Sequence, residues 1–292
     1  MTSILTNTSA MSALQTLRTI NSNLSTTQDR VSSGQKVGDA SDNVAYWSIS
    51  TTMNSDNKAL NAATDALGVG AAKVDTAYAA MDSAIDVVNE IKTKLTTASE
   101  TSVDKLQVQL EITKLQEQLT AIGQAASFNG ENWAIQGSGS STTVVDGFIR
   151  DSAGSVKVTT ATFNAGSYAM FSTITSGVGS GGILASVMDI ALQSNSTQGE
   201  IDAFMTTVQT ALDGLTDGAA ALGALSARID MQDSYSSKLS DAIESGVSRL
   251  VDADMEEESA RLSALQTQQQ LAVQSLSIAN SSSQNIMSLF RG

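Results

Sequence analysis

The sequence predicts a mainly α protein: a long antiparallel helical rod or coiled coil with paired N- and C-terminal helices and a small β-containing insertion. Three observations predict this fold. The 292-residue chain contains no proline, so nothing of that kind interrupts long helices. Apolar residues recur at spacings of three and four along most of the chain, as in amphipathic helices. Aromatic residues make up only 4% of the chain, so its core must be largely aliphatic, which favours packing of helix on helix.

The N-terminal half predicts several helices in succession. Apolar stripes of helical spacing occupy residues 10–31, 49–67, 74–95 and 108–126. The first stripe ends near Gly34, a typical helix terminator. Residues 35–43 are expected to form a loop, with Ser41 or Asp42 as the N-cap of the next helix. Gly68 and Gly70 either interrupt that helix or only loosen it.

Turns and a composition change follow the last of these stripes. Residues 99–102 and Phe-Asn-Gly at 128–130 are expected to be turns. Residues 136–184 are rich in Gly, Ser and Thr, and contain β-like runs at 144–149, 156–163 and 168–174.

The helical pattern resumes near Leu184. Thr197 and Glu200 have the spacing of a capping box. A stripe then runs over 201–250, and a helix of about fifty residues is expected there. A final helical pattern covers 262–290.

Charge is distributed unevenly along the chain. Residues 1–35 carry a net charge of +1, and residues 260–292 carry +2. The overall net charge is −14, so the segment between the ends holds −17. A nearly uncharged helix therefore stands at each end, with acidic helices between the ends and the insertion. We expect the two ends to pair, so that the chain leaves and returns along one axis.

The uncharged ends predict association between copies of the chain. An exposed helix normally carries a charged outer face, whereas these ends offer Gln, Ser, Asn and Thr, which can be buried once hydrogen-bonded. One helix pair leaves most of that surface in water. The alternative is a pair of polar tails that fray in solution, and the two interpretations agree if the ends order on assembly. The side chains expected to pack between subunits are Leu17, Ile20, Leu24, Val31, Leu262, Leu265, Leu276, Ala279, Ile286 and Phe290.

Composition argues against several other functions. The chain has no His and no Cys, so the usual general base and the commonest metal ligands are missing. We expect no catalytic residue, no cofactor and no metal. A net charge of −14 argues against nucleic acid as a partner. No run of about 18 apolar residues occurs, so no membrane insertion is expected, and residues 1–11 lack the features of a signal peptide.

Three motifs point elsewhere but lack their context. The glycines of GVGSGG at 177–182 match a dinucleotide-binding fingerprint locally, but no βαβ unit surrounds them, so we interpret the segment as a flexible linker. Ser-x-x-Lys at 55–58 and 102–105 has the spacing of some hydrolases without their partner motifs. The acidic residues of 252–258 lack a Gly-centred calcium loop, and a solvated helix start explains them better.

Both ends of the chain resemble bacterial flagellin. The stretch RVSSGQKVGDASDNVAYWSIS (30–50) is similar to the family's Leu-Ser-Ser-Gly and Asp-x-x-Ala signature, with Val31 in the place of the Leu. Phe-Asn-Gly at 128–130 matches the family's turn. Segment 248–292 has the family's Asp-x-Asp, Gln-rich and Ala-Asn elements and its closing Leu-Phe-Arg. The resemblance covers about 1–135 and 185–292.

The resemblance implies a layered filament subunit. Residues 1–35 and 251–292 would form the inner coiled coil, residues 36–135 and 185–250 the helical rod, and residues 136–184 a small, β-rich outer insertion that varies in the family. It also implies an extracellular homopolymer of many copies in the flagellar filament. Members of the family are exported by the flagellar type III channel without a cleaved signal peptide. Their partners are an export chaperone, a cap protein and hook-junction proteins.

We therefore predict a structural subunit, not an enzyme, that polymerises into the bacterial flagellar filament for swimming motility. The alternative is a hook–filament junction protein or an extracellular adhesin built on the same coiled-coil ends.

Overall fold

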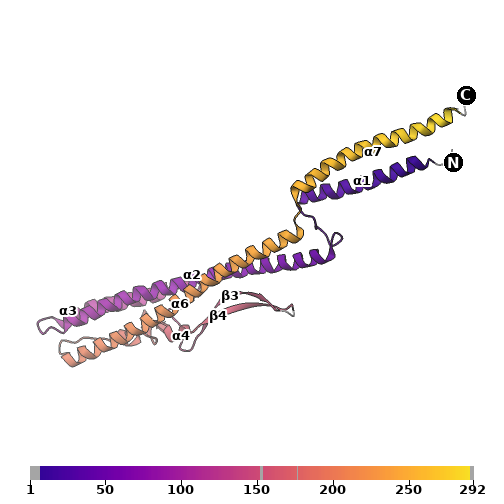
Figure 1. The fold of residues 1–292 in the computed structure, drawn as a ribbon. Helices are drawn as coiled ribbons and strands as arrows, with labels where there is room; N and C mark the ends of the chain where they lie inside the picture. Colours follow the sequence, from indigo (N-terminus) through magenta and orange to yellow (C-terminus); the bar gives the residue numbers. More distant parts are fainter. Residues whose placement is uncertain (1–6, 152–153, 176, 290–292) are drawn as a thin grey trace. The chain divides into compact units, whose positions relative to one another are not determined.

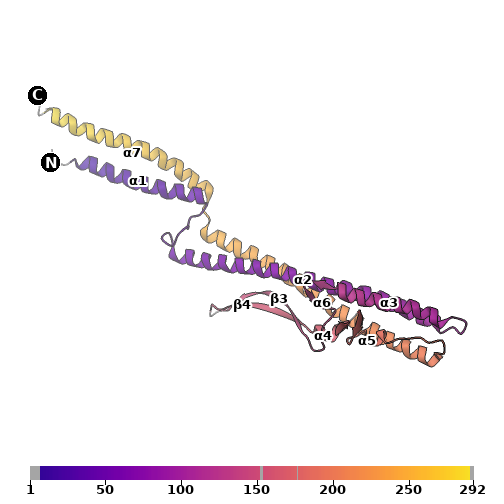
Figure 2. The same ribbon diagram turned by 180° about the vertical axis from the view of Figure 1, so that it is seen from behind.

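The computed structural model describes residues 7–151, 154–175 and 177–289, and it confirms a mainly α fold with a small strand-containing insertion (Figures 1 and 2). The helices are α1 (Thr8–Ser33), α2 (Val44–Ala98), α3 (Lys105–Ala125), α4 (Ala165–Tyr168), α5 (Ala185–Met188), α6 (Gln198–Val251) and α7 (Met255–Leu289). The strands are β1 (Ser127–Phe128), β2 (Glu131–Asn132), β3 (Thr142–Arg150), β4 (Val156–Phe163), β5 (Thr173–Thr175) and β6 (Val178–Ser180).

The chain divides into two compact units. The first comprises residues 1–57 and 241–292, and the second comprises residues 58–240. Helices α2 and α6 each contribute to both units. The three layers expected from the sequence stay a prediction.

Helix α1 of the first unit begins and ends at the residues that its sequence favours. Asn7 precedes it, and the side-chain oxygen of Asn7 accepts a hydrogen bond from the Ala10 amide at 3.0 Å, as an N-cap does. Gly34 follows the helix with φ of 73°, a left-handed conformation that glycine adopts without a steric penalty. The predicted end near Gly34 is confirmed, and α1 lies beside α7 in both views (Figures 1 and 2).

The loop between α1 and α2 is held by backbone hydrogen bonds to the last residue of α6 and to the segment that follows it. The Lys36 amide donates to the Val251 carbonyl at 2.7 Å, and the Ala253 amide donates to the Gly34 carbonyl at 2.9 Å. The Lys36 ammonium group also donates to the Arg249 carbonyl at 2.9 Å. The beginning of the loop, next to the end of α1, is therefore anchored to the end of α6 and the residues that follow it.

The predicted N-cap of α2 is wrong by one or two residues. Asn43 takes that position, since its side-chain oxygen accepts from the Tyr46 amide at 3.1 Å. Asp42 accepts instead from the amides of Gly38 and Asp39, at 3.0 and 3.2 Å, and so closes the loop. Three neighbouring polar residues could all cap a helix by type, and only the loop geometry selects one of them.

The main core of the second unit is largely aliphatic and lies among α2, α3 and α6, and it also contains the buried ring of Phe171. The apolar stripes predicted on these helices supply most of it, and the side chains of this core that are wholly buried include Ile91, Leu95, Ile112, Leu119, Ile201 and Leu215. Burial of Leu and Ile in such close packing is the main stabilising contribution to a helical domain. Tyr78, which belonged to the predicted stripe, is exposed.

Polar contacts also join α2 to α3, and α3 to the segment around α5. The Lys94 ammonium group pairs with Glu111 of α3 at 2.9 Å and with Glu90 of its own helix at 3.4 Å. Its hydrogen bond with Glu111 raises the pKa of Lys94 above the usual value. Gln116 is buried and donates to the carbonyls of Val187 and Ile190, so its amide is compensated by hydrogen bonds.

Among the described residues, three antiparallel hairpins lie between Ser127 and Ser180, and two of them belong to the insertion at 136–184. Asn129 and Gly130 both have positive φ in the turn between β1 and β2, as predicted for Phe-Asn-Gly. Strands β3 and β4 pair over their whole length with an irregularity between Val145 and Gly147, and they confirm two of the three predicted runs. Trp133 stacks on Phe163 of β4 with ring centroids 5.7 Å apart.

The third predicted run, 168–174, is wrong as a strand. Helix α4 extends to Tyr168, and only Thr173–Thr175 pairs in a sheet. Ala169, Met170 and Phe171 are consecutive and all buried, whereas a strand with one wet face would expose every second side chain.

Helix α6 begins with the predicted capping box. The Thr197 amide donates to the Glu200 carboxylate at 2.6 Å, and the Glu200 amide donates to the Thr197 hydroxyl at 3.4 Å. The helix then runs unbroken for 54 residues. Among the described residues, no helix is both long and apolar enough to cross a membrane.

Two glycines of α2 offer a matched test of this packing. A Cβ at Gly70 would collide with Val144 of β3, whereas a Cβ at Gly68 would meet nothing within 4 Å. We expect Gly70→Ala to destabilise the protein by about 1–3 kcal/mol, since the strand must move away. Gly68→Ala should stabilise it by up to about 1 kcal/mol, since alanine favours helix. Urea unfolding followed by circular dichroism measures both, and equal effects of the two substitutions would contradict this packing.

Candidate assembly surface

The line of contact between α1 and α7 contains the apolar residues that the sequence predicts. Leu265 is buried at 8% exposure, and the other seven whose side chains are described are half-buried: Leu17, Ile20, Leu24, Val31, Leu262, Leu276 and Ala279. The side chain of Ile286 and the whole of Phe290 lie outside the described residues. The eight described side chains are buried or half-buried within the single chain, and the role of all ten residues between subunits stays a prediction.

Polar side chains also bridge the two helices. The Gln269 amide donates to the Asn21 side-chain oxygen at 2.8 Å, and the Asn7 amide donates to the Ala279 carbonyl at 3.0 Å. Uncharged side chains can therefore satisfy one another along this pair at a small desolvation cost.

The outer faces of the pair expose large apolar side chains that the predicted stripes omit. Among the described residues they include Met11 and Leu14 of α1 and Leu271, Val273 and Ile278 of α7, with Ile278 at 69% exposure. Leu271 and Ile278 are seven residues apart and share one face of α7. A signal for them exists in the sequence, because they are apolar residues away from the stripe in segments that carry almost no charge.

A shallow groove of about 490 Å³ lies between the two helices. Small side chains line it: Thr8, Ser9, Ser12, Ala13, Thr16, Ala272 and Ser275. Small side chains let another helix approach closely, and the groove carries no charge.

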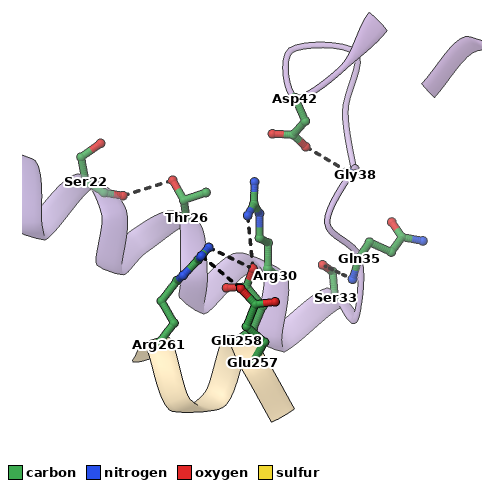
Figure 3. Close-up of polar contacts among 10 residues, drawn as sticks. All are labelled: Ser22, Thr26, Arg30, Ser33, Gln35, Gly38, Asp42, Glu257, Glu258 and Arg261. Atoms are coloured by element: carbon green, nitrogen blue, oxygen red, sulfur yellow. Dashed lines mark hydrogen bonds and ion pairs between the residues drawn. The ribbon is translucent and has the colours of Figure 1, made fainter. Parts of the chain in front are cut away.

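One charged cluster joins the base of the pair (Figure 3). Glu258 of α7 is only 6% exposed, and its Oε1 accepts from Nη1 of Arg30 of α1 at 3.2 Å. Nη1 of Arg261 lies 3.6 Å from the same oxygen, and Nη2 of Arg261 donates to Glu257 at 3.2 Å. Oε2 of Glu258 and Nε of Arg30 are buried without a hydrogen-bond partner in the described part of the chain. A buried charge that loses its partner is costly, so this pair fixes how α1 and α7 align.

The loop beside this cluster is ordered by a second carboxylate (Figure 3). The amides of Asp39 and Gly38 donate to Asp42, and these hydrogen bonds lower the pKa of the Asp42 carboxyl below its ordinary value of 3.8. The carboxylate is thus held in its ionised form where the chain enters α2.

The acidic start of α7 is a helix cap. The amides of Glu256 and Glu257 donate to the side-chain oxygen of Asp254, at 3.0 and 3.2 Å. Glu256, Glu257 and Glu258 occupy the first turn, where the helix dipole favours negative charge. Within residues 7–151, 154–175 and 177–289, no group of three acidic side chains is placed to hold a metal ion.

The backbone conformation and the close packing of segment 177–182 explain why it is rich in glycine. Gly177 has φ of 83° at the turn after β5, and a Cβ at Gly179 would collide with the ring of Phe171. Gly182 has φ of 73° beside the carbonyls of Ala169 and Met170. The segment forms a hairpin packed on the core, so the expectation of a flexible linker is wrong.

Comparison with known protein sequences identifies the family of the chain. The Bacterial flagellin N-terminal helical region matches residues 4–138, and the Bacterial flagellin C-terminal helical region matches residues 205–290. The chain belongs to the bacterial flagellin family. Flagellin A and Flagellin C of Rhizobium meliloti strain 1021 are 43% and 47% identical to it, and Flagellin of Brucella melitensis biotype 1 is 46% identical. Each similarity covers 100% of both chains.

Family membership gives the function in outline. Flagellins are structural proteins, and this flagellin is a subunit of the extracellular flagellar filament. The alternative of a junction protein or adhesin is not favoured, because these relatives, matched over their full lengths, are themselves flagellins.

Almost all of the insertion at 136–184 lies outside both matched regions. Residues 139–204 lie between them. The alignment with Flagellin A runs over 394 positions, so it contains about 100 positions that this 292-residue chain lacks, whereas the alignment with the Brucella melitensis protein runs over 293. Length therefore differs widely among relatives of similar identity.

The buried Glu258 can be tested against its exposed neighbour Glu257. We expect Glu258→Ala to weaken the α1–α7 pair by about 1–3 kcal/mol, because Arg30 loses its partner. Amide hydrogen exchange in α1 and α7 should then speed up about tenfold or more. Glu257→Ala removes only an exposed ion pair with Arg261 and should change exchange less than threefold. Equal effects would remove the special role of Glu258.

The loop gives a pH-dependent prediction. Because the pKa of Asp42 is lowered in the folded state, its hydrogen bonds stabilise the loop fully above pH 3.8 and are lost as the pH falls through the lowered value. The amide signals of Gly38 and Asp39 in NMR spectra should therefore shift with a midpoint below 3.8. Asp42→Asn should abolish that transition, and Asp39→Asn should preserve the one seen at Gly38. A midpoint at or above 3.8 would contradict the structure.

Proposed function

We propose that the paired chain ends are the surface through which copies of this flagellin polymerise. One observation carries the proposal: the outer faces of α1 and α7 expose Met11, Leu14, Leu271, Val273 and Ile278 on helices almost without charge. The desolvation of such faces costs little free energy. Their apolar area stays in contact with water, which is unfavourable, until another copy covers it.

The energy available is of the right order for a polymer contact. Full burial of a Leu, Ile or Met side chain is worth about 1.5–3 kcal/mol, so five partly exposed ones supply on the order of 5 kcal/mol. Association of two proteins costs an estimated 4–15 kcal/mol. One such contact alone gives little net binding, and several contacts per subunit make a filament. Contacts that repeat head to tail without closing produce a helical assembly.

The layers and partners expected from the resemblance belong to the same proposal. Residues 1–35 and 251–292 line the filament interior, residues 36–135 and 185–250 surround them, and residues 136–184 face outward. The flagellar type III channel exports the chain without a cleaved signal peptide. An export chaperone covers the C-terminal segment before assembly, and the cap and hook-junction proteins meet the growing filament. Family membership supports these assignments. The exposed apolar side chains of α1 and α7 support the chaperone in particular, because they need a binding partner until the chain polymerises.

Removal of the C-terminal helix tests the proposal. We expect a chain lacking residues 262–292 to form no filaments in electron micrographs and no pellet on ultracentrifugation. The helices of the second unit should persist in its circular dichroism spectrum, because their core lies within residues 58–240. Normal filaments from the truncated chain would end the proposal.

Point substitutions distinguish a specific role of this surface from a general effect of removing exposed apolar side chains. Leu271→Gln with Ile278→Gln should raise the critical concentration for polymerisation by tenfold or more. Leu110→Gln on α3 serves as the control, because Leu110 is as exposed as Ile278 but lies in the second unit.

A further inference from the structure

The turn between β1 and β2 is the one place in the sequence where asparagine precedes glycine. Asn129 and Gly130 occupy the two turn positions with φ of 52° and 84°, and both residues are exposed. Positive φ at both positions explains why the turn uses this pair. The pair also brings a chemical property that the turn does not need. The backbone nitrogen of the second residue can attack the side-chain carbonyl carbon of the first and close a five-membered ring.

The backbone nitrogen of Gly130 is available for this attack. In the described part of the chain, the Gly130 amide donates no hydrogen bond that would have to break first. A Cβ at Gly130 would meet nothing within 4 Å, so neighbouring segments do not crowd the residue. Glycine itself has no side chain to hinder ring closure.

The side chain of Asn132, three residues later, gives the contrast. Its Nδ2 donates to the Gly123 carbonyl at 2.7 Å, and its Oδ1 accepts from the Ala134 amide at 2.9 Å. The bulky, buried side chain of Trp133 follows it. Within the described residues, no hydrogen bond of this kind holds the side chain of Asn129. Two asparagines of one hairpin therefore differ in every feature that favours the reaction.

The hairpin is small enough to open. Strands β1 and β2 have two residues each, and a two-stranded hairpin has little stability of its own. Ring closure requires the Asn129 carboxamide to turn toward the next backbone nitrogen, and local opening of so short a hairpin supplies that freedom.

We propose that Asn129 is a site of spontaneous deamidation, with the backbone nitrogen of Gly130 as the nucleophile. That nitrogen loses its proton to solvent hydroxide and bonds to Cγ of Asn129. The bond from Cγ to Nδ2 breaks, and Nδ2 takes up a proton and leaves as ammonia. Water then opens the succinimide ring: cleavage of the new bond to Cγ gives aspartate, and cleavage of the bond to the main-chain carbonyl carbon gives isoaspartate.

Either product weakens the hairpin. The Glu131 carboxylate pairs with the Lys73 ammonium group at 2.8 Å, and this hydrogen bond lowers the pKa of Glu131 below its ordinary value of 4.5. A carboxylate at position 129 therefore adds a second negative charge close to an ionised one. Isoaspartate also lengthens the main chain inside a two-residue turn, so Phe128 and Glu131 lose their register.

Mass spectrometry of the purified full-length chain tests the proposal. The chain is incubated at neutral and at alkaline pH and is then cleaved with a glutamate-specific protease. The fragment 118–131 contains Asn129 as its only asparagine. We expect the acid forms at 129 to accumulate at least tenfold faster than at Asn132, and isoaspartate to be part of the product. The rate should rise with pH, because the attacking nitrogen must lose its proton.

The variant Asn129→Gly is the matched control. It removes the carboxamide, and glycine keeps the positive φ that the turn requires. Its acidic shift on isoelectric focusing should be slower than that of the parent chain. Hydrogen exchange of residues 127–132 should be at least tenfold faster in the isoaspartate form than in the unmodified chain.

The opposite results are equally clear. A carboxamide that lasts as long at Asn129 as at Asn132 would overturn the proposal. Aspartate without isoaspartate would show that water attacks the carboxamide directly, and would remove Gly130 as the nucleophile. The reaction takes place within a single chain, so its test does not depend on polymerisation.

Discussion

The need to cover two chain ends that carry almost no charge is the constraint on which the rest of this structure depends. Helices α1 and α7 lie together, yet each keeps large apolar side chains on its outer face, Met11 on α1 and Ile278 on α7 among them. Charged residues there would make the pair soluble alone, but each would have to be desolvated on assembly. The chain places its charge elsewhere, on the acidic helices between the ends, and keeps its ends compatible with burial.

The small, uncharged side chains between α1 and α7 only weakly determine the register of the two helices. One ion pair adds the missing specificity. Leucines and alanines spaced at three and four can pack in more than one register. The contact of Arg30 with Glu258 favours one register, because a shift takes Arg30 away from the buried carboxylate and leaves it only Arg261, 3.6 Å away on its own helix. Backbone bonds of Gly34 and Lys36 to the segment before α7 act at the same end. Register is therefore set at the base, and the uncharged remainder of the pair follows from it.

Periodicity and caps made most of the helical fold predictable. The capping box at Thr197 and the glycine at 34 act over a few residues and were located correctly from sequence. Ile49, which belonged to a predicted stripe and is 48% exposed, and the run at 168–174 were predicted incorrectly, because their burial depends on which other segments approach them. A stripe of apolar residues does not reveal which of its members another segment covers.

A weak contact that is repeated along a polymer explains why the proposed assembly through the chain ends would be cooperative. The chain ends offer on the order of 5 kcal/mol, and the cost of fixing a subunit is an estimated 4–15 kcal/mol. In the proposed filament, a subunit at the growing end contacts several copies at once and loses its freedom only once. Two subunits that meet in solution would make only part of these contacts, so small oligomers would dissociate while long polymers would persist. The apolar surface of each chain end therefore needs to be only moderate, and the net charge of the chain can stay on the acidic helices between the ends.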